Sequence, residues 1–445
     1  MARVRELVGQ VTADLGQKSR DSSPVSSSET LERNIRVNTY HGIVSVMAVN
    51  LAAPFIGIFA VKSGASDFQV GLLSSGPALV SLLSMLPGGS LMDRLRRKRD
   101  ALALLILLNR LFYLFIATIP FFSPDRRAWL LVFAVALMNM PASIANIGWQ
   151  AFISKVIPAS RRAEAFATRN RLMNLAGTLV VVITGRVIDI VGFPLGYQLV
   201  FAGAFLMSLA EAWVLRQIDE PAPEAEEAGD GFGASPSLWT ALRGLGDNPR
   251  FVRYTLASIV FYLVWQTPWP LFTLYQVKVL GANNMWVSLL SLTNTGGTLL
   301  GYGFWARKCN ELGSLRTLFL SSLGIFIVPV AYAVSKSLLT VAMFNLLTGA
   351  IFSGVNLALF NHLLEVTPEG NKATYIALYT TAVNCSAILA PMLGVSLLRM
   401  LDFFWAFMVC AVLRLSGSFM FLIVERLERR ASGKESLGKG AGITA

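Results

Sequence analysis

Apolar residues gather along this chain in long runs that short polar loops separate. Each run is about 20 residues long, which as an α-helix spans the ~30 Å hydrocarbon core of a bilayer. Twelve such runs occur, near residues 39–62, 68–91, 101–122, 128–152, 172–192, 197–216, 252–277, 284–306, 316–335, 338–363, 374–398 and 403–424. The pattern predicts an all-α membrane protein with twelve transmembrane helices.

Three polar segments divide the runs into two groups of six. A Ser-rich tail occupies residues 1–36, a linker occupies 218–250, and a charged tail occupies 426–445. The linker begins rich in Pro, Glu, Ala and Gly, which is typical of a flexible solvated segment. Later in the linker, Leu238, Trp239 and Leu242 fit one face of a short interfacial helix. We therefore expect one six-helix bundle at 37–217 and a second at 251–425.

Composition and charge support a membrane protein over a soluble one. Charged residues make up only 14% of the chain, hydrophobic residues make up 54%, and the mean hydropathy is +0.58. Soluble domains carry about 25% charged residues. The net charge of +12 is spread over short loops between apolar runs, so we expect no nucleic-acid partner. Three scattered cysteines and two histidines predict no disulfide framework and no metal site, and we expect no cofactor.

Basic residues lie mainly on one side of the predicted membrane. If both tails share a side, that side carries 29 of the 38 Lys and Arg residues, and the opposite loops carry six. The positive-inside rule then places both termini in the cytoplasm. The sequence predicts a multi-pass protein of the cell (plasma) membrane, in contact with the lipid bilayer.

The two groups of runs contain similar sequence segments at corresponding positions. "GSLMDRLRRK" follows the second run and "GFWARKCNEL" the eighth, which aligns Gly89 with Gly303. A stretch after the fourth run resembles one after the tenth, which aligns Pro158 with Pro368. Membrane loops converge on Gly, Pro and basic residues in any case, but two matches at nearly one offset favour a parallel duplication. We therefore expect two pseudo-symmetric bundles.

Residues ~37–425 resemble the major facilitator superfamily. The family signature between helices two and three, G-x-x-x-D-R-x-G-R-R, reads "GSLMDRLRRK" at 89–98, with Arg96 in place of the second glycine. The second copy departs further, since Arg307 stands where the acid would be. "VIPASRR" is similar to the family's P-x-x-x-R segment, whereas the fifth helix lacks the Gly-Pro pattern of the drug-antiporter branch. The resemblance implies a twelve-helix transporter fold.

The resemblance also implies a gate at the signature loop. In the family, the acid at the position of Asp93 lies against the positive N-terminal end of helix eleven, near Ala373 in this chain, while the cytoplasmic side is closed. A glycine at position 89 lets a neighbouring helix approach closely. Alternatively, Asp93 only offsets the charge of its arginine neighbours. The gating candidates are Gly89, Asp93, Arg94, Arg97, Lys98, Gly303, Arg307 and Lys308.

Three charged residues inside apolar runs are candidates for ion coupling, because a lipid-facing charge is costly. They are Arg110 in the third run, Glu211 in the sixth and Arg414 in the twelfth. Glu211 is the best candidate proton carrier, since a buried carboxyl can titrate near neutral pH. The alternative for all three is structural pairing or snorkelling.

Three other polar residues in or near apolar runs have simpler interpretations. Arg186 and Asp189 lie about one turn apart in the fifth run, and we expect them to pair with each other. His41 lies at the entrance of the first run, and we expect it at the surface, with a role as a titrating sensor as the alternative.

The family lines its central cavity with helices one, four, seven and ten. The matching residues are Asn50, Asn139, Asn146, Trp149, Gln150, Trp265, Gln266, Trp269, Asn345, Asn356 and Asn361. Amides and indoles dominate this set, which suits a neutral or amphipathic solute. The alternative is that they bond helix to helix or mark the membrane interface. "WQTPWP" at 265–270 predicts a broken outer end of helix seven, where a gate can move.

These features together predict a secondary active transporter that works by alternating access. We expect a small-molecule substrate, protons as the coupling ion, export as the favoured direction, and a monomer. Because no cluster of His, Asp or Ser lies at one membrane face, the chain is not expected to be an enzyme. A non-transporting receptor or assembly factor that retains the fold stays open as the alternative.

Overall fold

The computed structural model describes residues 24–95, 98–220, 246, 248–368 and 372–441. Helices and short turns account for the described chain. The short helix predicted near Leu238 lies outside the described residues.

Six rods, by which we mean a long helix or a series of consecutive helices, build the first half of the molecule. In chain order they are α2 (Pro24–Ala52) with η1 (Ala53–Phe55) and α3 (Ile56–Lys62); α4 (Asp67–Arg94); α5 (Lys98–Thr118) with η2 (Ile119–Phe121); α6 (Pro124–Leu137) with α7 (Asn139–Val156); α8 (Ala159–Val191); and α9 (Leu195–Leu215). The start of α4 is fixed by a capping box, in which Ser66 and Gln69 bond each other's backbone amides. Pro54 lies in η1 between α2 and α3, where its missing N–H interrupts the helical hydrogen-bond ladder.

Six more rods build the second half. They are α11 (Pro249–Gln266) with α12 (Trp269–Leu274) and the π-helical turn η5 (Tyr275–Val279); α13 (Asn284–Leu312); α14 (Ser314–Leu323) with η6 (Gly324–Phe326) and α15 (Ile327–Val334); α16 (Leu338–Val366); α17 (Lys372–Met400); and α18 (Phe403–Ala441). Three clusters of buried apolar side chains lie within one half each, and a fourth, mainly of the first half, also includes Leu274 of α12. The predicted fold class, twelve helices in two bundles of six, is confirmed.

Ten rods are long and apolar enough to cross a membrane, and the seventh and eighth are the exceptions. α11 carries Arg250 and Arg253 near its start and ends after 18 residues. α13 carries the polar stretch "SLTNTGG". Its low apolarity fits its position, because α13 packs along α16 on one side and against α8 of the other half.

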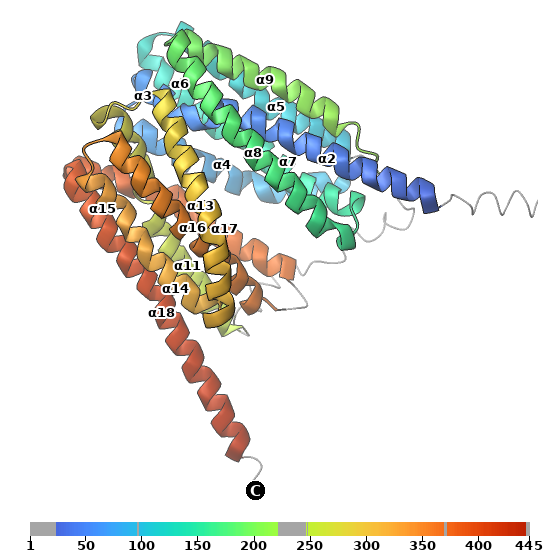
Figure 1. Cartoon of the computed structure of the whole chain (residues 1–445), viewed down its shortest axis with the longest axis vertical. Coiled ribbons are helices and arrows are strands. Elements are labelled where there is room, and N and C mark those ends of the chain that lie inside the picture. The colour runs from blue at the N-terminus through green and yellow to red at the C-terminus, as the bar shows by residue number, and fades with distance from the viewer. Residues whose placement is uncertain (1–23, 96–97, 221–245, 247, 369–371, 442–445) are drawn as a thin grey trace, which may run out of the picture.

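Two helices extend into segments that the sequence assigned to polar tails. α2 already begins at Pro24, and α18 continues to Ala441. Figure 1 shows α18 projecting well beyond the other helices of the second half. The apolar pattern marks only the part of a helix that lies within the bilayer. It therefore misses the polar turns by which the helix extends beyond the bilayer.

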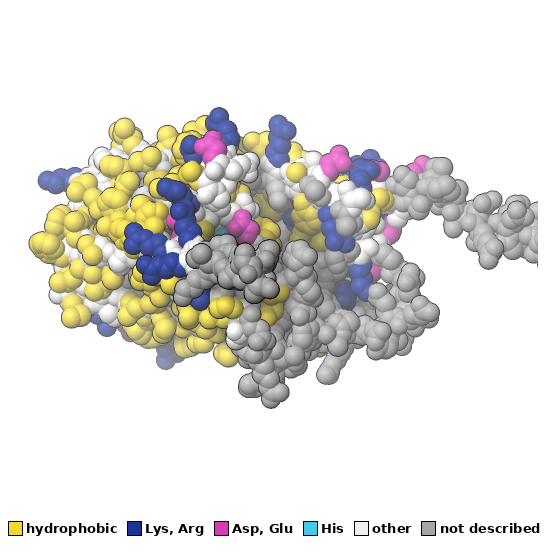
Figure 2. Space-filling model, turned by 90° about the horizontal axis from the view of Figure 1, so that it is seen from below, with side chains coloured by type: hydrophobic (Ala, Val, Ile, Leu, Met, Phe, Trp, Pro, Cys, Tyr) yellow, Lys and Arg dark blue, Asp and Glu magenta, His cyan; other side chains and the backbone are white. Residues whose placement is uncertain are grey.

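The two halves meet at one end and separate toward the other (Figure 1). They meet where α3 and the end of α8 approach the start of α13. They separate toward the start of α2 and the projecting end of α18. We call the joined end the far end and the other the tail end. In the view from below, Lys and Arg side chains lie scattered among hydrophobic ones (Figure 2).

Glycines set the closest helix contact in the second half. A Cβ on Gly297 of α13 would lie 1.9 Å from the carbonyl oxygen of Leu346, and one on Gly349 of α16 would lie 2.1 Å from that of Asn294. Neither site has room for a side chain. Small residues of this kind let two backbones pack directly in a membrane, where lipid gives no hydrophobic drive for helix association.

Candidate functional site

A carboxylate of the first half caps a helix of the second half at the far end. Asp189 of α8 accepts hydrogen bonds from the backbone N–H of Asn284, at 3.1 Å, and of Met285, at 2.8 Å. It also accepts from Asn284 Nδ2 at 2.8 Å, while Tyr197 donates its hydroxyl to Asn284 Oδ1 at 2.7 Å. The negative carboxylate thus lies at the positive N-terminal end of α13.

This contact replaces the pair that the sequence suggested. Arg186 and Asp189 are not an ion pair among the described residues, and Arg186 is exposed. The prediction was wrong because spacing along one helix gives no information about a helix end supplied by the other half. Gly185 permits the close approach, since a Cβ there would lie 2.7 Å from the carbonyl oxygen of Asn284.

An ion pair joins the halves beside this cap. Lys278 Nζ lies 2.7 Å from Asp67 Oδ1, at the first residue of α4. Both side chains are more than a third exposed, so the pair contributes about 1 kcal/mol at most. The cap on α13, made with backbone amides and partly buried, is the stronger of the two contacts. Together they join the two halves at the far end.

The ion pairs described at the tail end each join elements within one half. Arg33 pairs with Asp219 at 3.1 Å in the first half, and Arg250 pairs with Glu428 at 2.9 Å in the second. For the described residues, the halves are therefore tied together at the far end and tied only internally at the tail end. In Figure 1 the ribbons of the two halves likewise diverge toward the tail end.

A buried ionic cluster lies inside the first half. Glu211 of α9 is 1% exposed, and its Oε2 lies 3.4 Å from Arg110 Nη2 of α5. Its Oε1 lies 3.9 Å from His41 Nε2 of α2. Arg110 also donates to Asn109 Oδ1 at 2.7 Å. The structure thus brings together two predicted coupling residues and a histidine.

The prediction that His41 lies at the surface was wrong, since it is 4% exposed. The sequence placed it at the entrance of the first run. Because α2 begins at Pro24, His41 lies more than four turns inside the rod and faces the bundle interior.

Arg169 of α8 lies beside this cluster and contacts Trp149, a predicted cavity residue. It is 8% exposed, and its Nε donates to the carbonyl oxygen of Asn38 at 3.3 Å. Its guanidinium lies 4.5 Å from the ring centroid of Trp149, a cation–π contact. The sequence missed Arg169 because "SRRAEAFATRNRL" is polar enough to be interpreted as a loop, whereas α8 begins at Ala159.

Several buried polar atoms around the cluster have no hydrogen-bond partner among the described residues. They are both side-chain polar atoms of Asn38, both ring nitrogens of His41, Nε of Arg110 and Nε1 of Trp149. Buried polar groups are nearly always satisfied by protein or water, so such a concentration marks a place suited to internal water. Groups arranged in this way can pass a proton toward or away from Glu211.

Arg414 of α18 donates hydrogen bonds to the backbone near the break in the seventh helix. It is 1% exposed and donates to the carbonyl oxygens of Trp265 and of Ile325. Pro268 and Pro270 remove N–H groups that would continue the α-helical ladder across residues 264–270. A cation at these carbonyls satisfies backbone oxygens that have no water to bond in a membrane. For Arg414 the geometry favours this positioning role over ion coupling.

The predicted break in helix seven is present, because α11 ends at Gln266 and α12 begins at Trp269. Trp265 is buried and packs against Trp269, while the Gln266 amide oxygen is buried without a partner. A Cβ on Gly394 of α17 would lie 1.9 Å from the carbonyl oxygen of Thr267, so α17 packs directly on the break. The break is thus packed directly against α17, and it contains a buried polar atom of Gln266 that has no partner among the described residues.

The predicted cavity residues divide into two groups. Asn146, Gln150, Trp269 and Asn356 are exposed in the helical bundle, which suits an open cleft, since exposed polar residues are costly against lipid. Three amides bond backbone or sulfur instead: Asn139 to Val135, Asn345 to Leu290 and Asn361 to Cys309. Asn50 lies against Gly177 of α8.

The signature loop is only partly described. The side chains of Asp93 and Arg94 and the surroundings of Gly89 lie outside the described part, as does Arg97 entirely. The backbone N–H of Lys98 donates to Glu220 Oε1 at 3.0 Å, so the start of the linker caps α5. In the second copy, Lys308 pairs with Glu311 at 2.6 Å and Arg307 donates to the carbonyl oxygen of Gly303, within the same helix. The surroundings of Gly303 are open.

Comparisons with known proteins give one consistent family. Residues 42–338 and 254–444 match the sequence profile of the Major Facilitator Superfamily. The multi-drug resistance efflux pump PmrA of Streptococcus pneumoniae is 23% identical over 378 residues, which cover 81% of this chain and 88% of that protein.

Solved structures share the fold. The nucleoside transporter NupG matches with a TM-score of 0.65 at 12% identity, over 88% of this chain and 99% of that one. A D-xylose–proton symporter matches with a TM-score of 0.60 at 15% identity, over 89% and 97%. A bacterial homolog of the human lysosomal transporter Spinster, inward-facing and occupied, matches with a TM-score of 0.60 at 14% identity, over 90% and 97%.

Proposed function

This chain belongs to the major facilitator superfamily, and from that premise we propose that it exports small neutral or amphipathic solutes in exchange for protons. As a member it is a multi-pass membrane protein and a secondary transporter of small molecules, and the family is not one of enzymes. Solute class, direction, coupling ion and monomeric state are parts of the proposal. A receptor or assembly factor that kept the fold is the rival.

One observation carries the proposal. Contacts between the halves seal the far end, while the described ion pairs of the tail end stay within one half. A molecule of this shape suits alternating access, in which the bundles at 37–217 and 251–425 rock about a central cleft. The linker at 218–250 would join them flexibly, and tails at 1–36 and 426–445 would lie on the same side.

The direction and the orientation rest on separate arguments. The bias of 29 basic residues to six supports a cytoplasmic tail end in the plasma membrane. The similarity to a multidrug efflux pump supports export, with a cleft that loads from the cytoplasm. On the tail side, the Asp93–Arg94 loop would close the cleft against the start of helix eleven once the far end opens.

The charge of the cleft supports the proposed class of solute. The exposed residues Asn146, Gln150 and Asn356 are neutral amides, and Trp269 is an exposed aromatic. The described ionic cluster around Glu211 lies inside the first half, with side chains almost fully buried. A cleft without an exposed counter-charge among these residues supports uncharged or amphipathic solutes over phosphates and dicarboxylates.

Transport by purified protein in liposomes tests the proposal. An imposed gradient of about one pH unit supplies about 1.4 kcal/mol per proton, which sustains about tenfold accumulation of an uncharged solute at one-to-one coupling. We expect members of a panel of uncharged and amphipathic compounds to accumulate to that extent and to evoke proton flux.

Protein-free liposomes correct for passive permeation, and a proton ionophore should collapse the accumulation to equality. If no compound moves faster than in protein-free liposomes, while the same panel binds the protein, the receptor alternative is favoured. Accumulation that survives the ionophore but needs sodium would contradict the choice of coupling ion.

A further inference from the structure

A second buried histidine lies at the tail end of the second half. His362 of α16 is 2% exposed, and its Nδ1 lies 3.0 Å from Oε2 of Glu365 on the same helix. Its Nε2 lies 3.7 Å from Oε1 of Glu428 on α18. The imidazole therefore lies between two carboxylates from two helices, and each ring nitrogen faces one of them.

Two further helices join this group through the carboxylates. Ser314, the first residue of α14, donates its hydroxyl to Oε1 of Glu365 at 2.6 Å. Arg250 of α11 donates to Oε2 of Glu428 at 2.9 Å. We call His362, Glu365, Glu428, Ser314 and Arg250 the His362 cluster. It connects the tail-end portions of α11, α14, α16 and α18, and the transport cycle proposed above does not use it.

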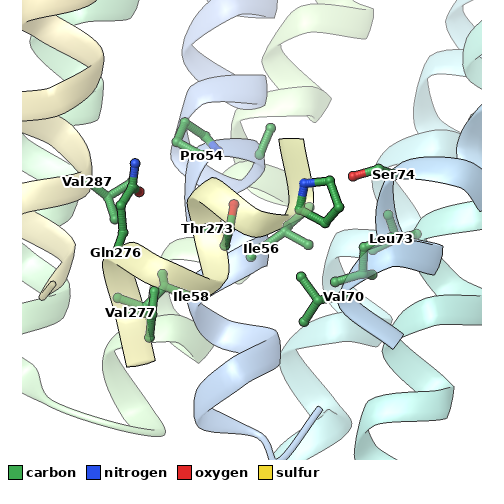
Figure 3. Close-up of a pocket in the computed structure, with 14 residues that line it drawn as sticks. Pro54, Ile56, Ile58, Val70, Leu73, Ser74, Thr273, Gln276, Val277 and Val287 are labelled. Carbon is green, nitrogen blue, oxygen red and sulfur yellow. The ribbon is translucent and has the colours of Figure 1, made fainter. Parts of the chain in front are cut away.

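The His362 cluster lies apart from the cavity between the halves. Residues such as Ile56, Val70 and Thr273 line that cavity (Figure 3). No member of the His362 cluster lines it, and all members belong to the second half. A role for the cluster therefore has to come from contacts within the second half.

The other titratable side chains around the ring do not form ion pairs with it. Tyr254 of α11 packs edge to face against His362, with ring centroids 4.7 Å apart, and donates its hydroxyl to the carbonyl oxygen of Leu359. The groups on the neighbouring helices are Tyr379 of α17, stacked on Tyr254; Cys309 and the Lys308–Glu311 pair of α13; the exposed Arg316 of α14; and the Glu425–Arg429 pair of α18. Among the described residues, the two carboxylates are thus the ionic partners of the imidazole.

Protonation of His362 decides how many of these contacts are hydrogen bonds. A neutral imidazole carries a proton on one ring nitrogen and a lone pair on the other, whereas an imidazolium donates from both. In the neutral form, one of the two carboxylates therefore faces a lone pair. The Nε2 of His362 has no hydrogen-bond partner among the described residues, because 3.7 Å to Glu428 is too long for a hydrogen bond.

We propose that the His362 cluster is a pH-dependent contact that docks α18 on the second half when the pH at the tail end falls and loosens it when the pH rises. Protonated His362 donates to Glu365 and Glu428 together, which ties α16 to α18. Deprotonation leaves α18 with the Arg250–Glu428 pair, whose arginine is 57% exposed and which contributes about 1 kcal/mol at most.

The docking has a consequence for the projecting part of the molecule. α18 continues past Glu428 to Ala441, so the contact sets the direction in which this end of the helix projects. Histidine is the side chain whose charge ordinarily changes between pH 5 and 8. If the tail end is cytoplasmic, as in the proposed function, the contact responds to cytoplasmic pH. The docking itself does not rest on that function.

Distances between spin labels on α14 and α18 test the proposal in the full-length protein in nanodiscs. The labels are attached to cysteines at Arg316 and Arg430, both exposed, in a background without the three native cysteines. We expect a narrow distance distribution at about pH 5.5 and a broader one at about pH 8.5, with the docked fraction falling at least about twofold.

Two pairs of variants assign the change to the cluster. His362→Gln should make the distances independent of pH, because glutamine does not titrate, whereas His41→Gln changes the other histidine of the chain and should keep the pH dependence. Glu428→Gln should reduce the change at least about twofold, because it removes the carboxylate on α18 that the imidazolium binds. Glu425→Gln, about one turn earlier on α18, should leave the change intact.

A pH-dependent change that persists in full in His362→Gln or in Glu428→Gln would overturn the proposal, as would constant distances in the labelled parent protein. Should His362→Gln not fold, Glu428→Gln decides the outcome in its place. Docking that responds to pH in a protein without proton-coupled transport would remove the proposed function and leave this inference standing. Transport with constant distances would do the reverse, so the two failures are distinguishable.

Discussion

Replacing Glu211 with Gln is expected to abolish uphill transport while leaving solute exchange intact. The amide occupies the space of the carboxyl and mimics its protonated form, so the halves still rock with solute bound. It cannot release a proton, so a gradient of about one pH unit should give no accumulation instead of about tenfold. Uptake into liposomes with and without the gradient, and exchange of labelled for unlabelled solute, measure the two properties separately.

Two controls separate coupling from loss of structure. Glu164→Gln changes an exposed carboxylate at the start of α8 and should leave accumulation unchanged. Since Glu211→Gln leaves Arg110 buried beside a neutral group, the double variant Arg110→Met, Glu211→Gln removes the charge as well. Should either Glu211 variant retain accumulation driven by protons, Glu211 does not carry the coupled proton.

Cross-linking the far end is expected to stop transport. In a background without Cys309, Cys385 and Cys410, cysteines at Asp67 and Lys278 can be joined by a short bifunctional thiol reagent, because these side chains already meet at 2.7 Å. The linked halves cannot separate there, so transport should fall at least about tenfold. Cleavage of the link should restore transport.

A matched pair in the first half controls for the cross-link itself. Arg33 and Asp219 also meet, at 3.1 Å, but both belong to the first half, which is expected to move as one unit. Linking cysteines at these two positions should therefore leave transport unchanged. Equal transport by both linked proteins would show that the far end need not open.

The sequence predicted the fold well because length and apolarity fix it. A run of about 20 apolar residues has few alternatives to a membrane-spanning helix, since lipid satisfies no backbone group. The seventh and eighth rods show the limit, because they are too polar to qualify by apolarity alone. They were predicted as apolar runs at 252–277 and 284–306, by a looser standard of apolarity than a full spanning window requires.

The candidate site was less predictable, because its key contacts join residues far apart in sequence. Glu211 was singled out for being charged within an apolar run, but nothing along the chain indicated that His41 would lie beside it. The cap that Asp189 places on α13 and the ion pair of Lys278 exist only once the halves meet. Arg414 illustrates another limit, since its partners are backbone carbonyls, which no sequence pattern marks.

Paired distance measurements test the central claim of two halves that open alternately. Spin labels at Asp125 and Lys336 report the far end, and labels at Glu164 and Arg316 report the tail end; all four positions are exposed. When a transported solute and a proton gradient are supplied, the far-end distance should lengthen as the tail-end distance shortens. Distances that change in the same direction, or that stay fixed in a preparation that transports, would contradict the account.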